Sequence, residues 1–412
     1  MDKEIQILSI AIPFLLNILF LTKIVSSFVD VKSIDIIIIN IFALFTLLYL
    51  FMHLKSLKYT NKLLFWVFAF NSISIFTSIF QISTDQMYIT IINTYSKITY
   101  WSNFLILGLI IGSLSSKPLV INQMKKYIIL YSFISFAIFL VFIYNGVDNY
   151  LNHVYYLVLM LPYFSFIKNK HLRFTMFLVT GILVLLSYKA TAIFGYIIYM
   201  ILYTYFDSKI NRDTANNRLG KLLLILVIVL IILPIVYLIQ VSLSLNILNK
   251  LNIAYLFETG GSGRIDIYLD VINMQKNSTI IQWIIGRGFD GVFRYTRWNI
   301  SAHNDFLEIL FDYGIFALFS YLITIFIITK YGFTLLKNKK TSAVPLLSSV
   351  GLVIFMSMTT HLIHYQSYYA SITLFWGFQI GFSTHIDKLI FAHKKEGKIY
   401  HENRHSHISQ HL

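Results

Sequence analysis

The sequence predicts an all-α polytopic membrane protein, and three observations lead to that prediction. Only 12 % of the 412 residues are charged, against roughly 25 % in a typical soluble protein. Hydrophobic residues make up 57 %, and the mean hydropathy is +0.70. Apolar runs of about 20 residues, the length that crosses a bilayer as a helix, recur along the chain. A soluble enzyme and a disordered protein are excluded, and the absence of cysteine excludes a disulfide scaffold.

We expect about twelve transmembrane helices in a single integral membrane domain, residues 1–412. The expected spans are 5–22, 34–52, 63–81, 98–115, 127–144, 151–167, 172–188, 190–206, 221–244, 305–329, 343–360 and 366–384. Only Tyr188-Lys189-Ala190 separates the seventh span from the eighth, so these two could also form one long helix.

The basic residues predict the orientation of these spans. Of the 33 Lys and Arg residues, 23 lie in the connections that face the cytoplasm if the N-terminus does, and 10 lie in the others. This asymmetry follows the positive-inside rule. It places both termini, including the tail 385–412, in the cytoplasm. The net charge of +15 is therefore explained by topology rather than by binding to nucleic acid. The abundance of Ile, Lys and Asn is typical of an AT-rich bacterial genome, so we expect a bacterial cytoplasmic (inner) membrane.

The segment 245–304, between the ninth and tenth spans, is the one long connection. It holds six of the ten outward Lys and Arg residues and is rich in Trp, Tyr, Phe and Ile. Loops longer than 12–15 residues are usually functional or disordered, and this aromatic composition argues against disorder. We therefore expect the extracytoplasmic chemistry of the protein to lie here.

Arg264 follows three glycines and a serine at the start of an apolar-periodic stretch. With Ser262 as N-cap, Arg264 lies in the first turn of a helix, where the helix dipole disfavours a cation. An anion bound at the same place explains the arginine, because helix N–H groups and a guanidinium both bind phosphate. The alternative is an ordinary ion pair with Asp266, Asp270 or Glu258.

Gly286-Arg287-Gly288 begins a second glycine-rich turn, with aromatic and basic residues after it. Arg287, Arg294 and Arg297 alternate with aromatic side chains, a mixture that suits sugars and phosphates. A plain tight turn and an interfacial aromatic belt are the alternatives.

His303 lies just before the tenth span and is a candidate general base. With Ser301 as N-cap, His303 falls in the first turn, where the dipole lowers a histidine pKa and keeps the ring able to accept a proton. On a helical wheel, Asp305, Glu308 and Asp312 lie about 140–180° from His303, so they are not expected to orient it. A structural histidine is the alternative.

A lysine, two histidines and an acidic pair complete the candidates. Lys189 is an ionisable group between two apolar spans, which predicts either a functional role or a side chain that extends to the outer surface. His361 and His364 could join a metal with His303, but no carboxylate is spaced to complete such a set, and we expect no metal and no other cofactor. Asp30 and Asp35 are the best acidic pair for a metal-dependent alternative. The His-rich C-terminal tail is expected to be solvated.

These residues, in this order, resemble the O-antigen ligase/Wzy polysaccharide polymerase superfamily. The resemblance covers residues of about 180–330 and rests on Ser187-Tyr188-Lys189-Ala190-Thr191-Ala192, Ser262-Gly263-Arg264, Ile285-Gly286-Arg287-Gly288-Phe289, Ala302-His303-Asn304-Asp305 and Gly314. The family commonly has arginine where this chain has Lys189.

The resemblance implies a membrane glycosyltransferase of the C type that uses no metal. Arg264 and Lys189 would hold the pyrophosphate of an undecaprenyl-linked glycan, and His303 would activate the acceptor hydroxyl. Beside these, we expect Arg287, Arg294, Arg297 and Asn304 to contact pyrophosphate or sugar. A polymerase joins lipid-linked repeat units, and a ligase transfers the glycan to another acceptor. The apparently Gram-positive composition favours the polymerase and a surface polysaccharide such as a capsule. A flippase and a chain-length regulator would be partners. A lipid-linked oligosaccharide flippase is the alternative from another class, although transporters usually show repeated halves and this chain shows none.

Overall fold

The computed structural model describes residues 60–80, 97–114, 150–187, 189–211, 260–297, 299–364 and 369–383, together with a few isolated positions between 94 and 137. The described residues form helices and connecting turns, without a strand among the assigned elements. The expected spans 5–22, 34–52 and 221–244 and the tail 385–412 lie outside these residues.

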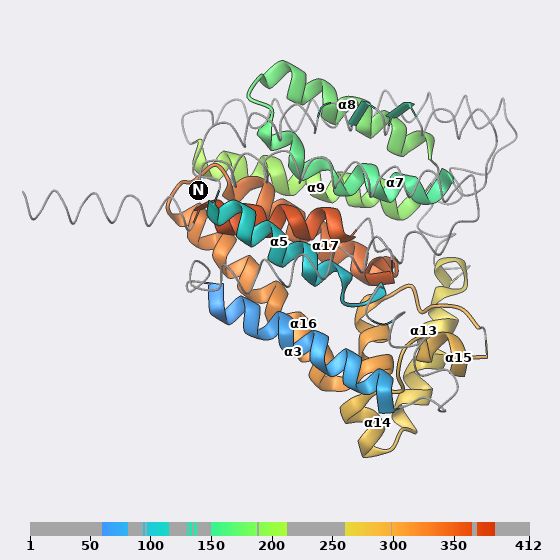
Figure 1. The fold of residues 1–412 in the computed structure, drawn as a ribbon. Coiled ribbons are helices and arrows are strands. Elements are labelled where there is room, and N and C mark those ends of the chain that lie inside the picture. The colour runs from blue at the N-terminus through green and yellow to red at the C-terminus, as the bar shows by residue number, and fades with distance from the viewer. Residues whose placement is uncertain are drawn as a thin grey trace, which may run out of the picture.

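Most of the described helices form a bundle, and three further helices lie at one end of it (Figure 1). The bundle consists of α3 (Asn61–Phe80), α5 (Tyr100–Leu114), α7 (Tyr150–Leu159), the 3₁₀ helix η3 (Leu161–Phe166), α8 (Lys170–Leu186), α9 (Ala190–Ile210), α16 (Asp305–Lys337), α17 (Ala343–Thr359) and the 3₁₀ helix η5 (Leu362–His364). Residues 369–383 add a last helical segment. The end group consists of α13 (Gly260–Lys276), α14 (Ile280–Ile285) and α15 (Gly291–Tyr295).

Three described helices are long and apolar enough to cross a membrane: Asn61–Ile79, Ala190–Ile210 and Asp305–Lys337. The helices α5 and α17 and the segment Val154–Phe166 are apolar but shorter. The helical class is therefore confirmed, whereas the number of twelve spans stays a prediction. The helix α8 ends at Leu186 and α9 begins at Ala190, so the seventh and eighth expected spans are two helices.

One large apolar core joins α3, α5, α7, α8, α9, α16, α17 and 369–383. Two pairs of glycines let α5 approach the last segment closely: a Cβ added to Gly108 would lie 2.3 Å from the Leu374 carbonyl oxygen, and one added to Gly377 would lie 2.1 Å from the Leu105 carbonyl oxygen. Gly112 and Gly381 repeat this contact one turn further on. Such small-residue pairs are typical of helix packing in membranes.

The helices at the end of the bundle have a small core of their own, made by Ile267, Val271, Val292, Ala302 and Phe311. This core binds α13 and α15 to the first turns of α16. The expected loop 245–304 is therefore an ordered helical layer over residues 260–297.

The long helix α16 is interrupted at Gly314, where φ is 79°. The turn after α14 packs against this kink. A Cβ added to Gly314 would lie 2.2 Å from the Ile284 carbonyl oxygen, and one added to Gly286 would lie 2.3 Å from the Asp312 carbonyl oxygen. Because both glycines have a positive φ, the two backbones meet at a distance that only residues without a Cβ allow.

Candidate active site

The helix α13 lies against the end of α17 and brings Arg264 to that point. The Arg264 guanidinium donates a hydrogen bond to the carbonyl of Thr359, the last residue of α17. One turn later, the Tyr268 hydroxyl lies 3.2 Å from the His303 carbonyl oxygen and 3.3 Å from that of Met358. A guanidinium has five N–H donors, so the bond to Thr359 orients Arg264 without using its whole donor capacity.

The start of α13 differs from the prediction. The helix begins at Gly260, so Ser262 lies inside the first turn and is not the N-cap. Glycine adopts helical angles, and the first N–H groups of a helix need no partner within it, so the glycines do not delay the start. Arg264 consequently lies beyond the first three helical residues, and the argument from the helix dipole weakens.

His303 immediately precedes the N-cap of α16 rather than lying in its first turn. The N-cap is Asn304, whose side-chain oxygen accepts the N–H groups of Phe306 and Leu307 at 3.0 and 3.1 Å. The prediction that Ser301 is the cap is wrong. Asn caps a helix as well as Ser does. The Asn304 amide also donates to the Met358 carbonyl at 3.4 Å, and Ser301, three residues earlier in the chain, does not make this contact. His303 then takes a left-handed conformation with φ 54°.

The ring of His303 stacks on that of His361, with centroids 4.5 Å apart and planes inclined by 21°. Burial lowers the pKa of His303 below its usual 6.5, and the charges of Arg264 and Lys189 lower it further, while Glu308 opposes them. His303 is therefore neutral at pH 7 and able to accept a proton. The two cations that the sequence singled out both lie within electrostatic range of this ring.

Lys189 lies between α8 and α9, within electrostatic range of His303. Its backbone N–H lies 3.3 Å from the Ser187 hydroxyl, and its carbonyl begins α9 as the acceptor of Ile193 N–H. The residue is half-buried. Three elements distant in sequence, the α8–α9 turn, α13 and the start of α16, thus supply the two cations and the histidine.

A buried histidine–carboxylate network lies behind His303, and the sequence analysis missed it. His361 is edge-on to His364, whose Nε2 lies 2.9 Å from Glu308 Oε2, and His364 Nδ1 lies 3.9 Å from Asp290 Oδ1. Burial lowers the pKa of His361 to about 3. Burial would also lower that of His364, but Glu308, Asp290 and Asp312 raise it to about 9. His361 is neutral and His364 is charged at pH 7.

The helical-wheel argument about Glu308 rests on a wrong premise. That argument placed His303 on the same helix as the three acids, but His303 lies outside α16, so the angle between them has no meaning. Through His364 and His361, the Glu308 carboxylate is connected to the face of the His303 ring. The only signal in the sequence was the pair His361 and His364 at the expected turn before the last span.

Arg287 has structural partners within the protein. Its guanidinium donates to Gln275 Oε1 at 2.9 Å, to the Met274 carbonyl at 3.2 Å and to the Ser278 hydroxyl, and it stacks on Phe311 at 4.0 Å. Its backbone N–H donates to α16 carbonyls, as does that of Gly288. The turn therefore binds the kinked backbone of α16 with the N–H groups that a phosphate loop would use. Arg287 is also not among the groups that shift the pKa of His303.

The other two arginines are exposed. Arg294 donates to the Arg287 carbonyl at 3.2 Å and lies over Tyr295. The backbone N–H of Arg297 lies 3.3 Å from Asp270 Oδ2. Within the described part of the chain, no group of three or more His, Asp or Glu side chains has an arrangement that could hold a metal ion.

This arrangement suits acid–base chemistry beside an anion. A neutral imidazole can take a proton from a hydroxyl, and two cations close to it can stabilise the negative charge that develops on a leaving phosphate.

The family model of the O-antigen ligase matches residues 175–322, which include Lys189, Arg264, Arg287, His303 and Asn304. No curated protein matches the chain. Members of this family are integral membrane proteins that transfer glycans, and they include ligases and related polymerases. The match includes Lys189, Arg264 and His303 of the candidate site, and residues 175–322 are similar to the O-antigen ligase family, as the sequence resemblance indicated.

Proposed function

We propose that the protein polymerises undecaprenyl-pyrophosphate-linked repeat units into a surface polysaccharide at the outer face of the cytoplasmic membrane. The observation that carries the proposal is the neutral His303 ring within the field of Arg264 and Lys189. A glycosyl transfer from a pyrophosphate needs a base at the acceptor hydroxyl and positive charge at the leaving group, and these residues supply both.

In the proposed reaction, the acceptor hydroxyl of one lipid-linked unit attacks the anomeric carbon of the glycan on another. The new C–O bond forms as the bond from the anomeric carbon to the pyrophosphate oxygen breaks, and the pyrophosphate keeps the electron pair. His303 takes the hydroxyl proton. Arg264 and Lys189 stabilise the released pyrophosphate, which is a good leaving group without a metal or a general acid.

Arg287, Arg294, Arg297 and Asn304 have more limited roles in this proposal. Arg287 and Asn304 hold the layer in place through the contacts described above. Arg294 and Arg297, exposed beside aromatic side chains, are the candidates for sugar contacts. His361, His364 and Glu308 position the His303 ring.

A ligase is the second candidate, because the matching family model is that of an O-antigen ligase. The same chemistry then ends on a different acceptor hydroxyl. The favoured polymerase differs from it in product: loss of a polymerase leaves single repeat units on the lipid, whereas loss of a ligase leaves long chains on the lipid.

Deletion of the gene and gel analysis of the lipid-linked glycans distinguish these candidates. We expect single repeat units to accumulate, and complementation with the intact chain to restore the polymer. His303→Gln should fail to complement at normal protein level, while His171→Gln, the same change at an exposed residue of α8, should succeed. Long lipid-linked chains would identify a ligase, and units confined to the cytoplasmic leaflet would identify a flippase.

A further inference from the structure

The helix α13 exposes a row of large apolar side chains along one face. Ile265, Leu269 and Ile272 are 44 %, 52 % and 37 % exposed. At 100° per residue, they and Lys276 fall within an arc of about 60°. We call Ile265, Leu269 and Ile272 the apolar row.

The other two faces of α13 are of different character. Ile267 and Val271 are buried against α15 and α16, and Gln275 on the same face is also buried. Asp266 and Asn273 are exposed on the flank of the apolar row that faces away from the buried residues. A helix with a buried face, an exposed apolar row and an exposed polar face, in that order around its axis, is suited to lie at a boundary between protein, lipid and water.

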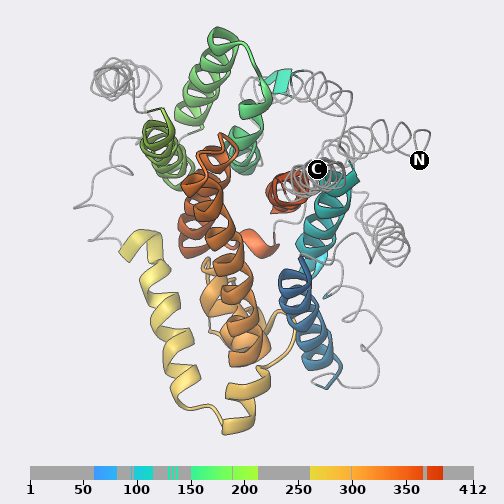
Figure 2. The ribbon, with the colours of Figure 1, turned by 90° about the vertical axis from the view of Figure 1, so that its left-hand side faces the viewer.

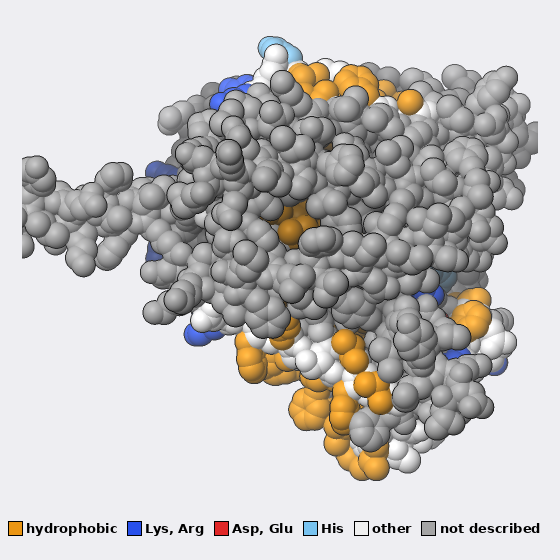
Figure 3. All heavy atoms as spheres, in the orientation of Figure 1, with side chains coloured by type: hydrophobic (Ala, Val, Ile, Leu, Met, Phe, Trp, Pro, Cys, Tyr) orange, Lys and Arg blue, Asp and Glu red, His pale blue; other side chains and the backbone are white. Residues whose placement is uncertain are grey.

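The short helix α14 extends this apolar surface. Ile280, Ile281 and Ile284 are 73 %, 63 % and 37 % exposed, and a capping box between Thr279 and Gln282 holds the helix in place. In Figure 3, orange apolar side chains gather along the lower edge, over the region where α3 and α14 lie in Figure 1.

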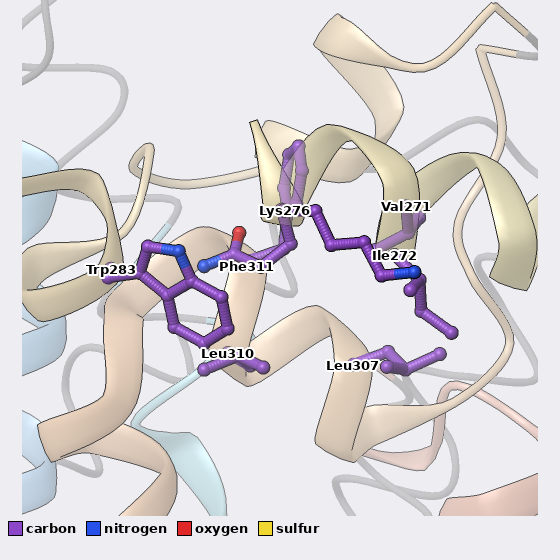
Figure 4. Close-up of a pocket in the computed structure, with 8 residues that line it drawn as sticks. Val271, Ile272, Lys276, Trp283, Leu307, Leu310 and Phe311 are labelled. Atoms are coloured by element: carbon purple, nitrogen blue, oxygen red, sulfur yellow. The ribbon is translucent and has the colours of Figure 1, made fainter. Parts of the chain in front are cut away.

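A cavity of about 180 Å³ separates the two helices on this side. Ile272 and Lys276 of α13 lie on one side of it and Trp283 of α14 on the other, with Leu307 and Leu310 of α16 below (Figure 4). Its lining is almost entirely apolar, so a hydrocarbon chain fits it better than water does.

The helix α13 lies crosswise to the long helices of the bundle, which is the direction expected of a helix at the membrane surface. Figures 1 and 2 both show α13 crosswise to α9 and α17, at the end of the bundle. Since helices that span a bilayer lie near its normal, a helix perpendicular to them at their end lies near the plane of the membrane surface.

We infer that the apolar row of α13, together with Ile280, Ile281 and Ile284 of α14, docks into the lipid leaflet at the face of the membrane where the candidate active site lies. Lys276, at the end of the row, extends to the lipid phosphates. Lipid is the occupant because the same chain places α16, whose Phe316 and Phe319 are also exposed and apolar, in the bilayer beside this surface. The docked helix would hold Arg264, which lies next to the row, at the height of lipid headgroups.

The placement of Arg264 at the height of the headgroups rests on the proposed function, whereas the docking of α13 and α14 does not. The test therefore measures depth in the membrane and not activity. Because the sequence contains no cysteine, single cysteines can be labelled without a background. Leu269→Cys and Ile281→Cys report on the apolar surface, and Asn273→Cys, on the polar face of the same helix, is the matched control. Each variant is labelled with an NBD maleimide in proteoliposomes of phosphatidylethanolamine and phosphatidylglycerol.

We expect blue-shifted emission at positions 269 and 281, with quenching by lipids that carry a nitroxide near the headgroup several-fold stronger than at position 273. Aqueous iodide should show the reverse order. Equal quenching at all three positions overturns the inference. Protection of positions 269 and 281 from iodide without nitroxide quenching also overturns it, because a protein partner or a second copy then covers the surface. If either of these quenching results is found while the cells still polymerise glycan normally, the docking inference fails and the proposed function stands.

Discussion

At the scale of single residues, the protonation of His303 decides the proposed chemistry. The charged and titratable groups around its ring are Arg264 and Tyr268 on α13, Lys189 before α9, Glu308 on α16, and His361. Because burial and the two cations lower the pKa of His303, we expect the transfer rate to be flat at neutral pH and to fall only below pH 6.5. Arg264→Gln should raise the acid midpoint, since a charge that disfavours imidazolium is removed. Initial rates against pH with purified enzyme and lipid-linked substrate check this. An unchanged midpoint would show that Arg264 does not act on the base.

Arg264 also tests whether charge alone is sufficient at the anion site. Arg264→Lys keeps the charge but loses the planar fork and the hydrogen bond to Thr359, so we expect turnover to fall by roughly 10- to 100-fold. Arg264→Ala should lose activity further. Polymer length and rate in membranes of equal protein content measure the effect, with Arg173→Lys on α8 as the matched control. Full activity of Arg264→Ala would remove this residue from the site.

At the scale of elements, the His364–Glu308 pair joins η5 to α16, and Asp290, Asp305 and Asp312 surround it. The pKa of His364 in the fold, about 9, lies above its usual 6.5. The stabilisation is therefore complete below pH 6.5 and is lost as the pH rises through 9. We expect the melting temperature in detergent to fall between about pH 7 and 10. His364→Gln should lower it at pH 7 and flatten this slope. A slope that persists unchanged in His364→Gln would assign it to other groups.

The contact between the α14 turn and the kink of α16 gives a second prediction at this scale. Gly314→Ala would place a Cβ 2.2 Å from the Ile284 carbonyl oxygen, at a residue with a positive φ. We therefore expect the free energy of unfolding to fall by at least about 1–3 kcal/mol. Gly195→Ala is the control, because its Cβ meets side chains and no backbone, the nearest atom being Leu352 Cδ1 at 3.1 Å, within the regular helix α9. Thermal unfolding of the two purified variants compares them. Equal melting temperatures would show that the kink tolerates a side chain.

At the scale of the whole molecule, the charge asymmetry predicts the orientation. Residues 245–304 should face outward and both termini inward. Asn273→Cys should react with a membrane-impermeant maleimide in intact cells, and Lys395→Cys only after permeabilisation. Labelling of both from outside would refute the orientation and the outer location of the site together.

The sequence and the structure agree best on the apolar helices. The boundaries of α3, α8, α9 and α17 lie within a few residues of the expected spans, because a helix that crosses a bilayer is encoded locally by its length and hydropathy. The break at Lys189 was also visible locally, as a charged residue flanked by two apolar runs.

The sequence by itself also determined which residues to examine. Lys189, Arg264 and His303 stand out as polar groups beside apolar segments, and the fold brings both cations within electrostatic range of His303. Only the tertiary structure decided their partners. Asn304 contacts Met358 at the end of α17, and the assignment of Arg287 to structure depends on Gln275 and Phe311. The network of His361, His364 and Glu308 likewise exists only once η5 packs against α16. Hydropathy is a property of adjacent residues, whereas the ion pair of His364 with Glu308 and the ring stack of His303 on His361 form between residues that only the packed helices bring together.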